Sequence, residues 1–473
     1  MKQLTFFKYL IILGAPLTAG VLGLLLPYLP WWLPVGLGLA PVVAVVVWVW
    51  PSAGLVFLLM LIFGIIPSPN QKLTDLATLM YCVYIFMRRW SDVGQMIRDH
   101  KRQILSLMIL AVCVLFSAIY GYFYNANFRP YVYNETMVLM YWMLFPATAL
   151  LVVRIDSANE IFRAVVGLAV LFAVLAVTQS ILRVNLNFST GSRLEGLDAA
   201  SGGMAGLARS IVPGTLIILF AFYCSLATIL RREGRTRLWV FVLLITICAL
   251  FVNFGRGLWA VTFIGTFIIA MLMGWRFTVR LFLVCVCAGI LLISALTVLK
   301  PEVLSAVVHR VTSIKSEGGI NTSFGWRLTE NQFAWTKIRA NPALGIGLGG
   351  EYKPRLIPNA LFTEQTRYIH NGYLYILLKM GVIGLLLVLC NHVLLVHSLA
   401  RGRVFRESGT APRLAAIGLL VAVLLLSFTQ PEIFSPSAMA AMAVLIPIAL
   451  RVRIPVRCNI KISLSSDGRG QWK

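Results

Sequence analysis

Apolar runs, separated by short polar segments, recur along the whole chain. Most of them are close to the ~20 residues that an α-helix needs to cross a ~30 Å hydrocarbon layer. A helix satisfies its own backbone hydrogen bonds in lipid, so these runs predict transmembrane helices. The predicted spans are 8–28, 33–50, 53–66, 71–88, 104–121, 136–153, 161–181, 210–230, 238–254, 257–273, 281–298, 373–398, 414–429 and 437–450. We therefore predict an all-α polytopic membrane protein. The number of transmembrane helices is about 12–14, because the run 53–66 is short enough to be re-entrant.

Composition agrees with this pattern. The chain has 473 residues, of which 59% are hydrophobic and 12% are charged, and its mean hydropathy is +0.86. Soluble proteins have roughly 25% charged residues, so a soluble fold is excluded. No small-residue cleavage site follows the first apolar run, and we expect that run to be a span and not a removable signal peptide. The eight cysteines lie in apolar runs or in the basic tail without zinc-site spacing, so we expect neither a disulfide nor a structural metal.

Basic residues gather in a few segments between the predicted spans. Their clusters fall within 88–102, 231–237, 276–280, 401–413 and the tail 451–473. Alternating the spans places every cluster on one side of the membrane, which the positive-inside rule assigns to the cytoplasm together with both termini. Topology therefore explains most of the formal net charge of +24, and no nucleic-acid partner is expected.

The outward side carries the longer polar segments. These are the loops 122–135, 182–209 and 430–436, a turn at Asn253–Gly257, and the insertion 299–372. The predicted organisation is a transmembrane bundle over 1–298, an outward domain over 299–372, a second part of the bundle over 373–450 and a basic tail over 451–473.

The insertion is predicted to be mostly helical. Helices are expected over Pro301–Ile314 and Trp326–Ala340, the second with Thr322 or Ser323 as its N-cap. The segment Gly345–Gly350 is predicted to be a flexible loop. It contains GxGxxG spacing, but no preceding strand or following helix supports a dinucleotide site. Bases outnumber acids in the insertion, which suggests an anionic partner, although a solvated basic loop would have the same charge.

Arg256 interrupts a nearly continuous apolar stretch and lies between Gly255 and Gly257. An arginine near membrane depth is costly unless it reaches the interface or a polar cavity. It could cap a hairpin at the level of the lipid headgroups. Alternatively, its planar guanidinium could bind a diphosphate, which the glycine turn would allow to approach the backbone.

Three further residues on the outward side are candidates. Arg193 lies in a glycine-rich loop, and Arg327 begins a predicted helix in which an ordinary ion pair with Glu330 would be the simplest role. His370 stands where a polar, basic segment gives way to an apolar helix. It could accept a proton from a hydroxyl group, or it could be a headgroup contact.

Other side chains on the same side could act as a base, but few could bind a metal. Carboxylates that could replace His370 as the base are Glu135, Glu195, Asp198 and Glu432. Only His309 and His370 lie outward, and no H-E-x-x-H motif occurs, so no metal site is predicted.

Four stretches taken in order resemble the bacterial O-antigen ligase and O-antigen polymerase superfamily of membrane glycosyltransferases. They are SRLEGLDAASGGMAG, NFGRGLWAV, GWRLTENQFAWTKIRANPALGIGLGG and YIHNGYLYILLKMGVIG, which together cover roughly residues 190–390. The resemblance implies a multi-pass enzyme of the bacterial inner membrane with its active site on the periplasmic face, so that the insertion 299–372 would be a periplasmic domain.

The resemblance also implies roles for individual residues. Arg256, Arg327 and Arg193 would bind the diphosphate of an undecaprenyl-diphosphate-linked glycan donor, and His370 would activate the acceptor hydroxyl. Arg367 and Asn371, which flank His370, are further candidates for substrate binding. No metal or other cofactor is implied.

Several functions remain open from the sequence. A ligase would use lipid A–core oligosaccharide as the acceptor, whereas a polymerase would use another lipid-linked glycan, and we favour the ligase. A transporter or flippase for the lipid-linked glycan is the alternative of another class. It would predict ionisable residues near the bilayer midplane and inverted repeats, and neither is evident here.

Overall fold

The computed structural model describes most of the chain. The described residues are 45–63, 71–153, 155–183, 193–195, 209–212, 214–233, 236–299, 308, 323–354, 366–401, 409–452 and 454. The predicted span 8–28, most of 33–50, the predicted helix Pro301–Ile314 apart from Val308, and the tail from 455 lie outside these residues.

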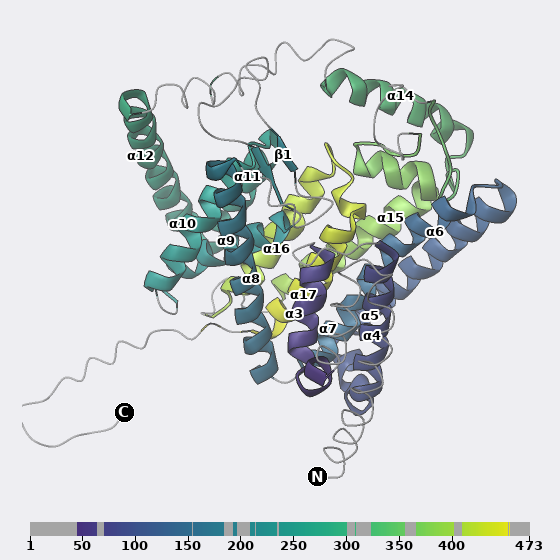
Figure 1. Ribbon diagram of the computed structural model, residues 1–473, viewed down its shortest axis with the longest axis horizontal. Coiled ribbons are helices and arrows are strands. Elements are labelled where there is room, and N and C mark those ends of the chain that lie inside the picture. Colours follow the sequence, from purple (N-terminus) through teal and green to yellow (C-terminus); the bar gives the residue numbers. More distant parts are fainter. Residues whose placement is uncertain are drawn as a thin grey trace, which may run out of the picture. The chain divides into compact units, whose positions relative to one another are not determined.

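The described residues are almost entirely helical (Figure 1). The helices are α3 Pro51–Ile62, α4 Gln71–Arg88, α5 Val93–Ile119, α6 Arg129–Met140, α7 Leu144–Leu151, α8 Ile155–Leu182, α9 Thr215–Leu230, α10 Thr236–Val252, α11 Arg256–Met273, α12 Trp275–Leu299, α14 Ser323–Ala340, α15 Gly372–Ala400, α16 Ala411–Leu426 and α17 Pro436–Arg451. Two short strands, β1 Arg193–Glu195 and β2 Arg209–Ile211, form an antiparallel pair.

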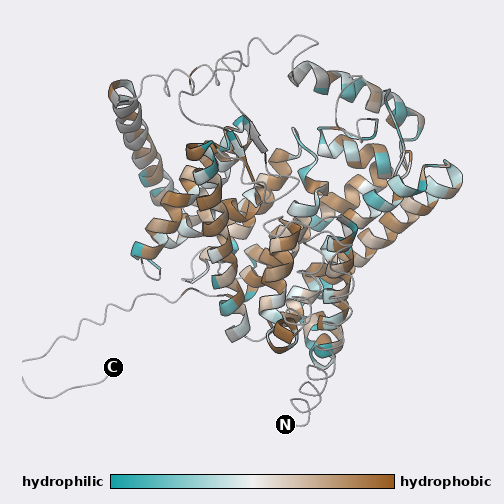
Figure 2. Ribbon diagram, in the orientation of Figure 1, coloured by the Kyte–Doolittle hydropathy of each residue, from teal (hydrophilic) through white to brown (hydrophobic). Residues whose placement is uncertain are grey.

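Several helices have the length and composition of membrane spans. Four segments are long and apolar enough to cross a membrane, namely Trp90–Tyr124, Ser157–Leu182, Arg256–Met273 and Gly372–Ala400. The shorter apolar helices are α3, α9, α10, α16 and α17. Figure 2 shows hydrophobic residues along most helices and hydrophilic ones mainly near the helix ends and on α14. The predicted all-α polytopic membrane fold is therefore confirmed.

The chain divides into two compact units, Met1–Leu59 and Met60–Lys473. The described part of the first unit contains a helical turn at 45–49 and most of α3. Every other helix, and both strands, belong to the second unit, which contains all the candidate site residues.

The core of the second unit is built around α9. This helix is buried from Leu216 to Thr228 and packs against α8, α10 and α16. Tyr223 at its centre donates a hydrogen bond to the carbonyl of Val261 in α11 (2.9 Å). Two glycines permit this close packing, since a Cβ would lie 2.1 Å from the Tyr223 hydroxyl at Gly265 and 2.9 Å from its ring at Gly418.

The predicted span 136–153 is wrong in one respect, because it is not a single continuous helix. The sequence predicts a single helix over 136–153, but α6 ends at Met140, a 3₁₀ turn covers Tyr141–Met143, and α7 then begins at Leu144. Pro146 provides the physical reason, because a proline inside a helix removes a backbone hydrogen bond and clashes with the preceding turn.

The predicted span 373–398 is also interrupted, at Gly381. This residue has φ 67°, and a Cβ there would lie 2.0 Å from the carbonyl oxygen of Ala343. The loop after α14 packs into the break: the N–H of Ile346 donates to the carbonyl of Leu378 (2.8 Å), and the N–H of Val382 donates to a carbonyl of the same loop.

The segment Gly345–Gly350, predicted to be a flexible loop, is buried and hydrogen-bonded in the structure. Its glycines at 345, 347 and 349 have φ between 69° and 77°. The side-chain amide of Asn127 donates to two carbonyls of the loop, those of Ile346 (3.1 Å) and Leu348 (2.9 Å). The loop is therefore a packed part of the second unit.

The two ends of the helices in the second unit differ in charge. At one of them, here called the basic end, Arg231 donates to Thr410 before α16, Arg413 donates to the carbonyl of Leu450, and Arg451 pairs with an aspartate of α5. At the opposite end, here called the outward end, α11 and α15 begin and α16 ends. These described basic residues and the candidate site thus lie at opposite ends. The assignment of the basic end to the cytoplasm stays a prediction.

Candidate active site

The starts of α11 and α15 meet at the end of α16. The N–H of Gly372, the first residue of α15, donates to the carbonyl of Ser427 (2.7 Å). A Cβ at Gly257, the second residue of α11, would lie 3.4 Å from the hydroxyl of Thr429. Segments far apart in the sequence therefore converge on residues 427–429, and they bring Arg256 and His370 to the same end of the unit.

Arg256 is the first residue of α11 and is half-buried. The turn before it is tight, because Phe254 is fully buried at a positive φ of 50° and Gly255 is the N-cap residue. The first N–H groups of a helix lack partners within the helix and carry the positive end of its dipole. The guanidinium of Arg256 and the start of α11 together form an electropositive corner that suits an anionic group.

The strand pair β1–β2 lies beside this corner. In its register Arg193 pairs with Ile211 and Glu195 pairs with Arg209. Arg209 donates from Nε to the carbonyl of Asn253, in the turn that leads into α11 (2.9 Å). Strand β2 thus contacts the turn before Arg256, and Arg193 lies in the neighbouring strand β1. The role of the Arg193 side chain stays a prediction.

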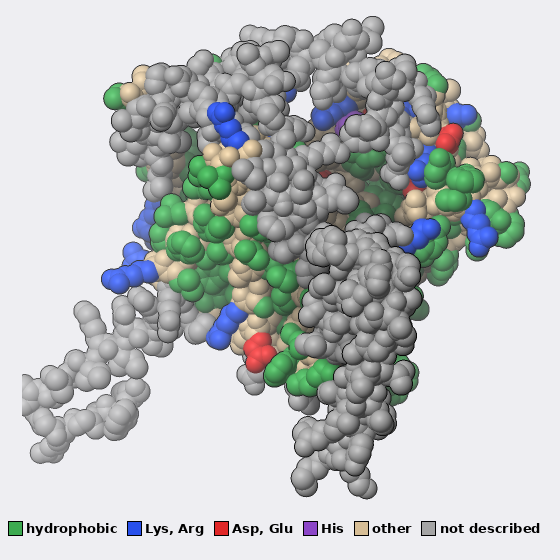
Figure 3. Space-filling model, in the orientation of Figure 1, with side chains coloured by type: hydrophobic (Ala, Val, Ile, Leu, Met, Phe, Trp, Pro, Cys, Tyr) green, Lys and Arg blue, Asp and Glu red, His purple; other side chains and the backbone are tan. Residues whose placement is uncertain are grey.

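His370 lies just before α15 and contacts Glu330 of α14. The Nδ1 atom of His370 is 2.7 Å from Glu330 Oε2, and the His370 backbone N–H donates to the same oxygen (3.2 Å). The His370 side chain is 36% exposed, whereas that of Glu330 is only 7% exposed. Figure 3 shows a histidine with Lys or Arg side chains beside it on this face of the molecule. Glu330 thus holds one side of the His370 ring, while part of the ring stays accessible to a ligand.

The charge of Glu330 fixes the tautomer of His370. Burial alone would raise the pKa of Glu330, but the hydrogen bond and charge of His370, followed by those of Lys353, outweigh burial and hold the pKa below its ordinary value. Glu330 is therefore an ionised acceptor, and the Nδ1 atom of His370 must carry the hydrogen. In the neutral ring the free Nε2 atom is then a proton acceptor.

The proposed ion pair between Arg327 and Glu330 is not the arrangement that the structure shows. The Glu330 carboxylate instead pairs with Lys353 through Oε1 and with His370 through Oε2. Arg327 lies one turn earlier on α14, half-buried, and its Nε atom has no hydrogen-bond partner among the described residues. Arg327 therefore precedes Glu330, whose carboxylate holds His370, by about one helical turn. Diphosphate binding by Arg327 stays a prediction.

Asn371 has a structural role at the start of α15. Its side-chain oxygen accepts hydrogen bonds from the backbone N–H groups of Tyr373 (3.0 Å) and Leu374 (3.1 Å), which is the geometry of an N-cap. The cap fixes the entry of the chain into α15 and hence the position of His370. Substrate binding by Asn371 stays a prediction.

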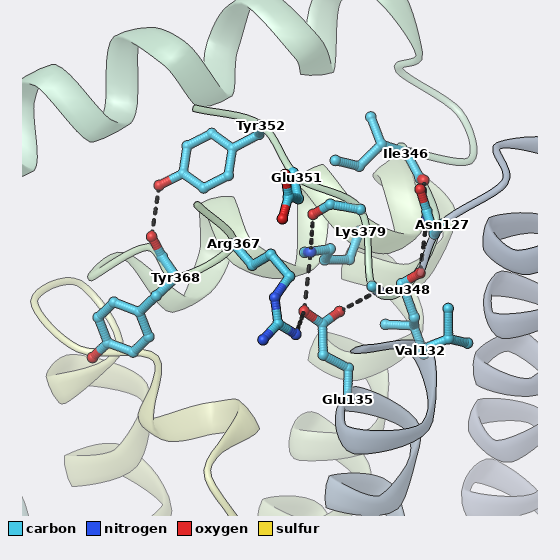
Figure 4. A network of polar contacts seen from close by, with 12 residues as sticks. Asn127, Val132, Glu135, Ile346, Leu348, Glu351, Tyr352, Arg367, Tyr368 and Lys379 are labelled. Atoms are coloured by element: carbon cyan, nitrogen blue, oxygen red, sulfur yellow. Dashed lines mark hydrogen bonds and ion pairs between the residues drawn. The ribbon is translucent and has the colours of Figure 1, made fainter. Parts of the chain in front are cut away.

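Arg367 belongs to a buried network that is shown in Figure 4. Its guanidinium lies 3.4 Å from the centroid of the Tyr131 ring and 3.7 Å from Oε1 of Glu135. Lys379 of α15, which is fully buried, donates to the same Glu135 oxygen (3.1 Å) and to the carbonyl of Gly350 (2.5 Å). Substrate binding by Arg367 stays a prediction, and the structure shows it as part of an ionic cluster.

Glu135 connects this network to the packed glycine loop. Its Oε2 atom accepts a hydrogen bond from the backbone N–H of Gly349 (2.7 Å), and its other oxygen receives Lys379 and Arg367. Two cations neutralise one buried carboxylate and leave a local positive excess. This pairing favours Glu135 as a structural anion, which makes it a poor substitute for His370 as a base.

The other carboxylates proposed as bases are placed differently. Burial raises the pKa of Glu432 above its ordinary value, against a hydrogen bond from Ser435 that lowers it. The backbone of Glu195 lies in β1, and Asp198 lies outside the described residues. Among the described residues, no three His, Cys, Asp or Glu side chains are grouped so that they could hold a metal ion. Transfer without a metal stays a prediction.

Sequence reasoning missed Lys353, Arg209 and Lys379, and it missed the role of Glu330. Lys379 left a signal, because a lysine in the middle of an apolar run requires a buried partner. Lys353 and Arg209 left none, and Glu330 was visible only as a helical neighbour of Arg327, since the partners of all three residues are remote in the sequence.

Comparison with known families identifies part of the chain. Residues 241–389 match a family model described as O-antigen ligase. The match is under half of the chain, and it covers α11, α14 and the start of α15 with Arg256, Arg327 and His370. No curated protein matches this chain.

Proposed function

We propose that this chain transfers a glycan from undecaprenyl diphosphate to an acceptor sugar, and the match of residues 241–389 to a family model described as O-antigen ligase supports the proposal. The reaction would take place on the periplasmic face of the bacterial inner membrane without a metal ion. A ligase that uses lipid A–core oligosaccharide is the form we favour. The observation that carries the proposal is the contact between His370 and Glu330 at the end of the helices where Arg256 begins α11.

The first requirement of the reaction is a nucleophilic hydroxyl. The Nε2 atom of His370 accepts the proton of the acceptor hydroxyl as its oxygen attacks the anomeric carbon of the donor glycan. Glu330 keeps the hydrogen on Nδ1 and stabilises the imidazolium that forms. Lys353 holds the other oxygen of Glu330, so that the carboxylate is oriented on both sides.

The second requirement is a leaving group that can hold negative charge. As the new glycosidic bond forms, the bond between the anomeric carbon and the diphosphate oxygen breaks, and its electron pair stays on the diphosphate. Arg256 and Arg327 would neutralise this charge, together with the N–H groups at the start of α11. A preorganised donor of this kind typically lowers the barrier by ~3 kcal/mol. The proton on His370 is then released to water or to the departing diphosphate.

The location of the residues fits a donor with a lipid part and a sugar part. Arg256 stands at the end of a helix that is apolar enough to cross a membrane, and His370 precedes another. The polyprenyl chain would lie along the apolar surfaces of the helices while the diphosphate and sugar lie at their ends. A donor that is half lipid and half sugar needs both environments at one site.

The test is reconstitution of the full chain in liposomes with an undecaprenyl-diphosphate-linked glycan and lipid A–core oligosaccharide, in the presence of EDTA. Glycosylated lipid A–core is the expected product, and His370→Ala and Arg256→Ala should each abolish it. His397→Ala is the matched control for the first, because His397 is exposed at the other end of α15. Arg276→Ala, at an exposed position near the start of α12, is the control for the second. Transport of the glycan without a new glycosidic bond would contradict the proposal.

The same assay separates the ligase from the polymerase. With only lipid-linked repeat units present, a polymerase would lengthen the chain that is attached to undecaprenyl diphosphate. The ligase would leave these units unchanged until lipid A–core oligosaccharide is added.

A further inference from the structure

A cavity of about 390 Å³ lies next to the residues described above. Its walls come from α4, the second half of α6, the segment before α15 with Arg367 and the first turn of that helix, and residues 431–436 at the start of α17. Its volume is within the range of ~300–1,000 Å³ that is typical of small-ligand sites. None of the reaction steps proposed so far uses this cavity.

The polar side chains of the cavity are held in place by other parts of the protein. Asp75 of α4 is buried and accepts a hydrogen bond from the hydroxyl of Tyr141 (2.8 Å). Glu135 of α6 is fixed by the N–H of Gly349 and by Lys379. Preorganised acceptors of this kind bind the hydroxyl groups of a ligand without having to be ordered first.

Aromatic rings form the rest of the wall. Tyr368, Tyr375 and Phe434 line the cavity, and the rings of Tyr375 and Phe434 lie 5.1 Å apart. Aromatic surface next to carboxylate and amide groups matches the two sides of a sugar ring, which has apolar C–H faces and hydroxyl groups at its edge. A hydrocarbon chain would leave the polar atoms of this wall without a ligand partner. The carboxylates of Asp75 and Glu135 lie in the wall together with the guanidinium of Arg367, so the wall offers both acceptors and donors, which suits hydroxyl groups.

One tyrosine connects the cavity to the proposed base. Tyr368 lines the cavity, and its ring packs edge-on against that of His370 with centroids 4.9 Å apart. Its backbone carbonyl is held by the hydroxyl of Tyr352 (2.8 Å). The Tyr368 ring would therefore separate a sugar in the cavity from His370. A neighbouring sugar unit of the same glycan could extend past the edge of this ring to the histidine.

We infer that this cavity binds a sugar of the acceptor glycan and presents the hydroxyl of that sugar, or of its neighbour, to His370. The inference rests on the proposed function and names the place of its second substrate. Asp75, Asn134 and Glu135 bind the hydroxyl groups, and the tyrosines stack on the ring. The donor diphosphate stays at the start of α11.

The experiment measures initial rates of transfer by the full chain in liposomes, with the concentrations of the undecaprenyl-diphosphate-linked glycan and of the acceptor varied separately. Val138→Trp fills the cavity from α6, and Asp75→Asn keeps its volume while removing a charge. Tyr133→Ala is the matched control, because Tyr133 is on the same helix, is exposed and does not line the cavity. Folding of each variant is checked by its thermal unfolding.

Loss of binding that is equal in the ground state and the transition state raises KM and leaves kcat unchanged. Both cavity variants should raise the acceptor KM by roughly tenfold or more, which corresponds to ~1.4 kcal/mol. The donor KM, and all parameters of Tyr133→Ala, should stay within about twofold of the wild type. A rise in the donor KM alone, or no change in either KM, would overturn the inference and leave the proposed function intact. If the wild type forms no product with either lipid A–core oligosaccharide or lipid-linked repeat units, the proposed function fails and the inference falls with it.

Discussion

The sharpest prediction concerns Glu330. Replacement of Glu330 by Gln removes the charge that holds His370 but changes the side-chain shape very little. The amide can present its NH₂ group to Nδ1 and so place the hydrogen on Nε2, which is the wrong tautomer for a base. Since general base catalysis contributes about 10²–10⁴-fold, we expect kcat to fall by at least ~10²-fold while the donor and acceptor KM values change little.

The substitution also affects folding, and its cost follows from the geometry. The side chains of Glu330 and Lys353 are 7% and 4% exposed, and they form an ion pair. Removing one member of a buried pair typically costs about 3–5 kcal/mol, because the other charge stays buried without compensation. The double variant Glu330→Gln, Lys353→Met removes both charges and should recover most of this stability, yet its kcat should stay low.

The assay is steady-state transfer with purified protein, with unfolding followed by intrinsic tryptophan fluorescence. Gln332→Ala is the control, since Gln332 is exposed on the same helix. A folded double variant with a kcat within about twofold of the wild type would refute the role of Glu330, because general base catalysis is worth far more than that. Glu330→Asp should give an intermediate rate, because its shorter side chain lengthens the 2.7 Å contact.

Three further predictions address other parts of the site. Arg256→Lys should retain only part of the activity, since an ammonium cannot form the bidentate contact of a guanidinium with phosphate. Arg276→Ala is the control and should transfer glycan at the wild-type rate. The activity of both variants is measured as kcat/KM. Gly381→Ala should lower the thermal midpoint strongly or prevent folding, because the position has a positive φ and no room for a Cβ, whereas Gly167→Ala, where nothing lies within 4 Å, should be tolerated. Lys379→Met should lower the thermal midpoint, but by less than the about 3–5 kcal/mol of an uncompensated buried charge, because Glu135 keeps Arg367 and the N–H of Gly349 as partners. An unchanged midpoint would contradict the network.

The pH dependence of stability follows from the lowered pKa of Glu330. A carboxyl whose pKa is lower in the folded protein stabilises the fold above its unfolded value, which is about 4.5, and this contribution is lost as the pH falls through the folded pKa. The wild type should therefore lose stability as the pH is lowered below ~4.5, and the double variant should lose less. An equal loss in both proteins would show that Glu330 is not the titrating group.

The helices were largely predictable from the sequence, because the membrane imposes a simple rule on apolar runs. The predicted spans 71–88, 257–273 and 437–450 nearly coincide with α4, α11 and α17. The interruptions were harder to predict, and for different reasons. Pro146 was visible in the sequence, whereas the break at Gly381 depends on a loop that packs against it from more than thirty residues earlier.

The candidate site was only partly predictable for the same reason. His370 and Arg256 could be selected because each contrasts with its apolar surroundings. Glu330 was visible as a neighbour of Arg327, and helical spacing favoured an ion pair between them. In the structure the Glu330 carboxylate pairs with His370 and Lys353 and not with Arg327. Tertiary packing determines this choice of partner, and it could not be predicted from helical spacing.

The central claim is that the diphosphate of the donor binds at the start of α11 while the reacting carbon faces His370. The most direct measurement is an electron cryo-microscopy structure of the His370→Ala variant in a lipid nanodisc with an undecaprenyl-diphosphate-linked glycan. The account predicts diphosphate density within hydrogen-bonding distance, roughly 2.7–3.2 Å, of the Arg256 guanidinium, with the first sugar directed toward position 370. Diphosphate density at the basic end of the helices, or at the outward end but out of reach of Arg256, would contradict it.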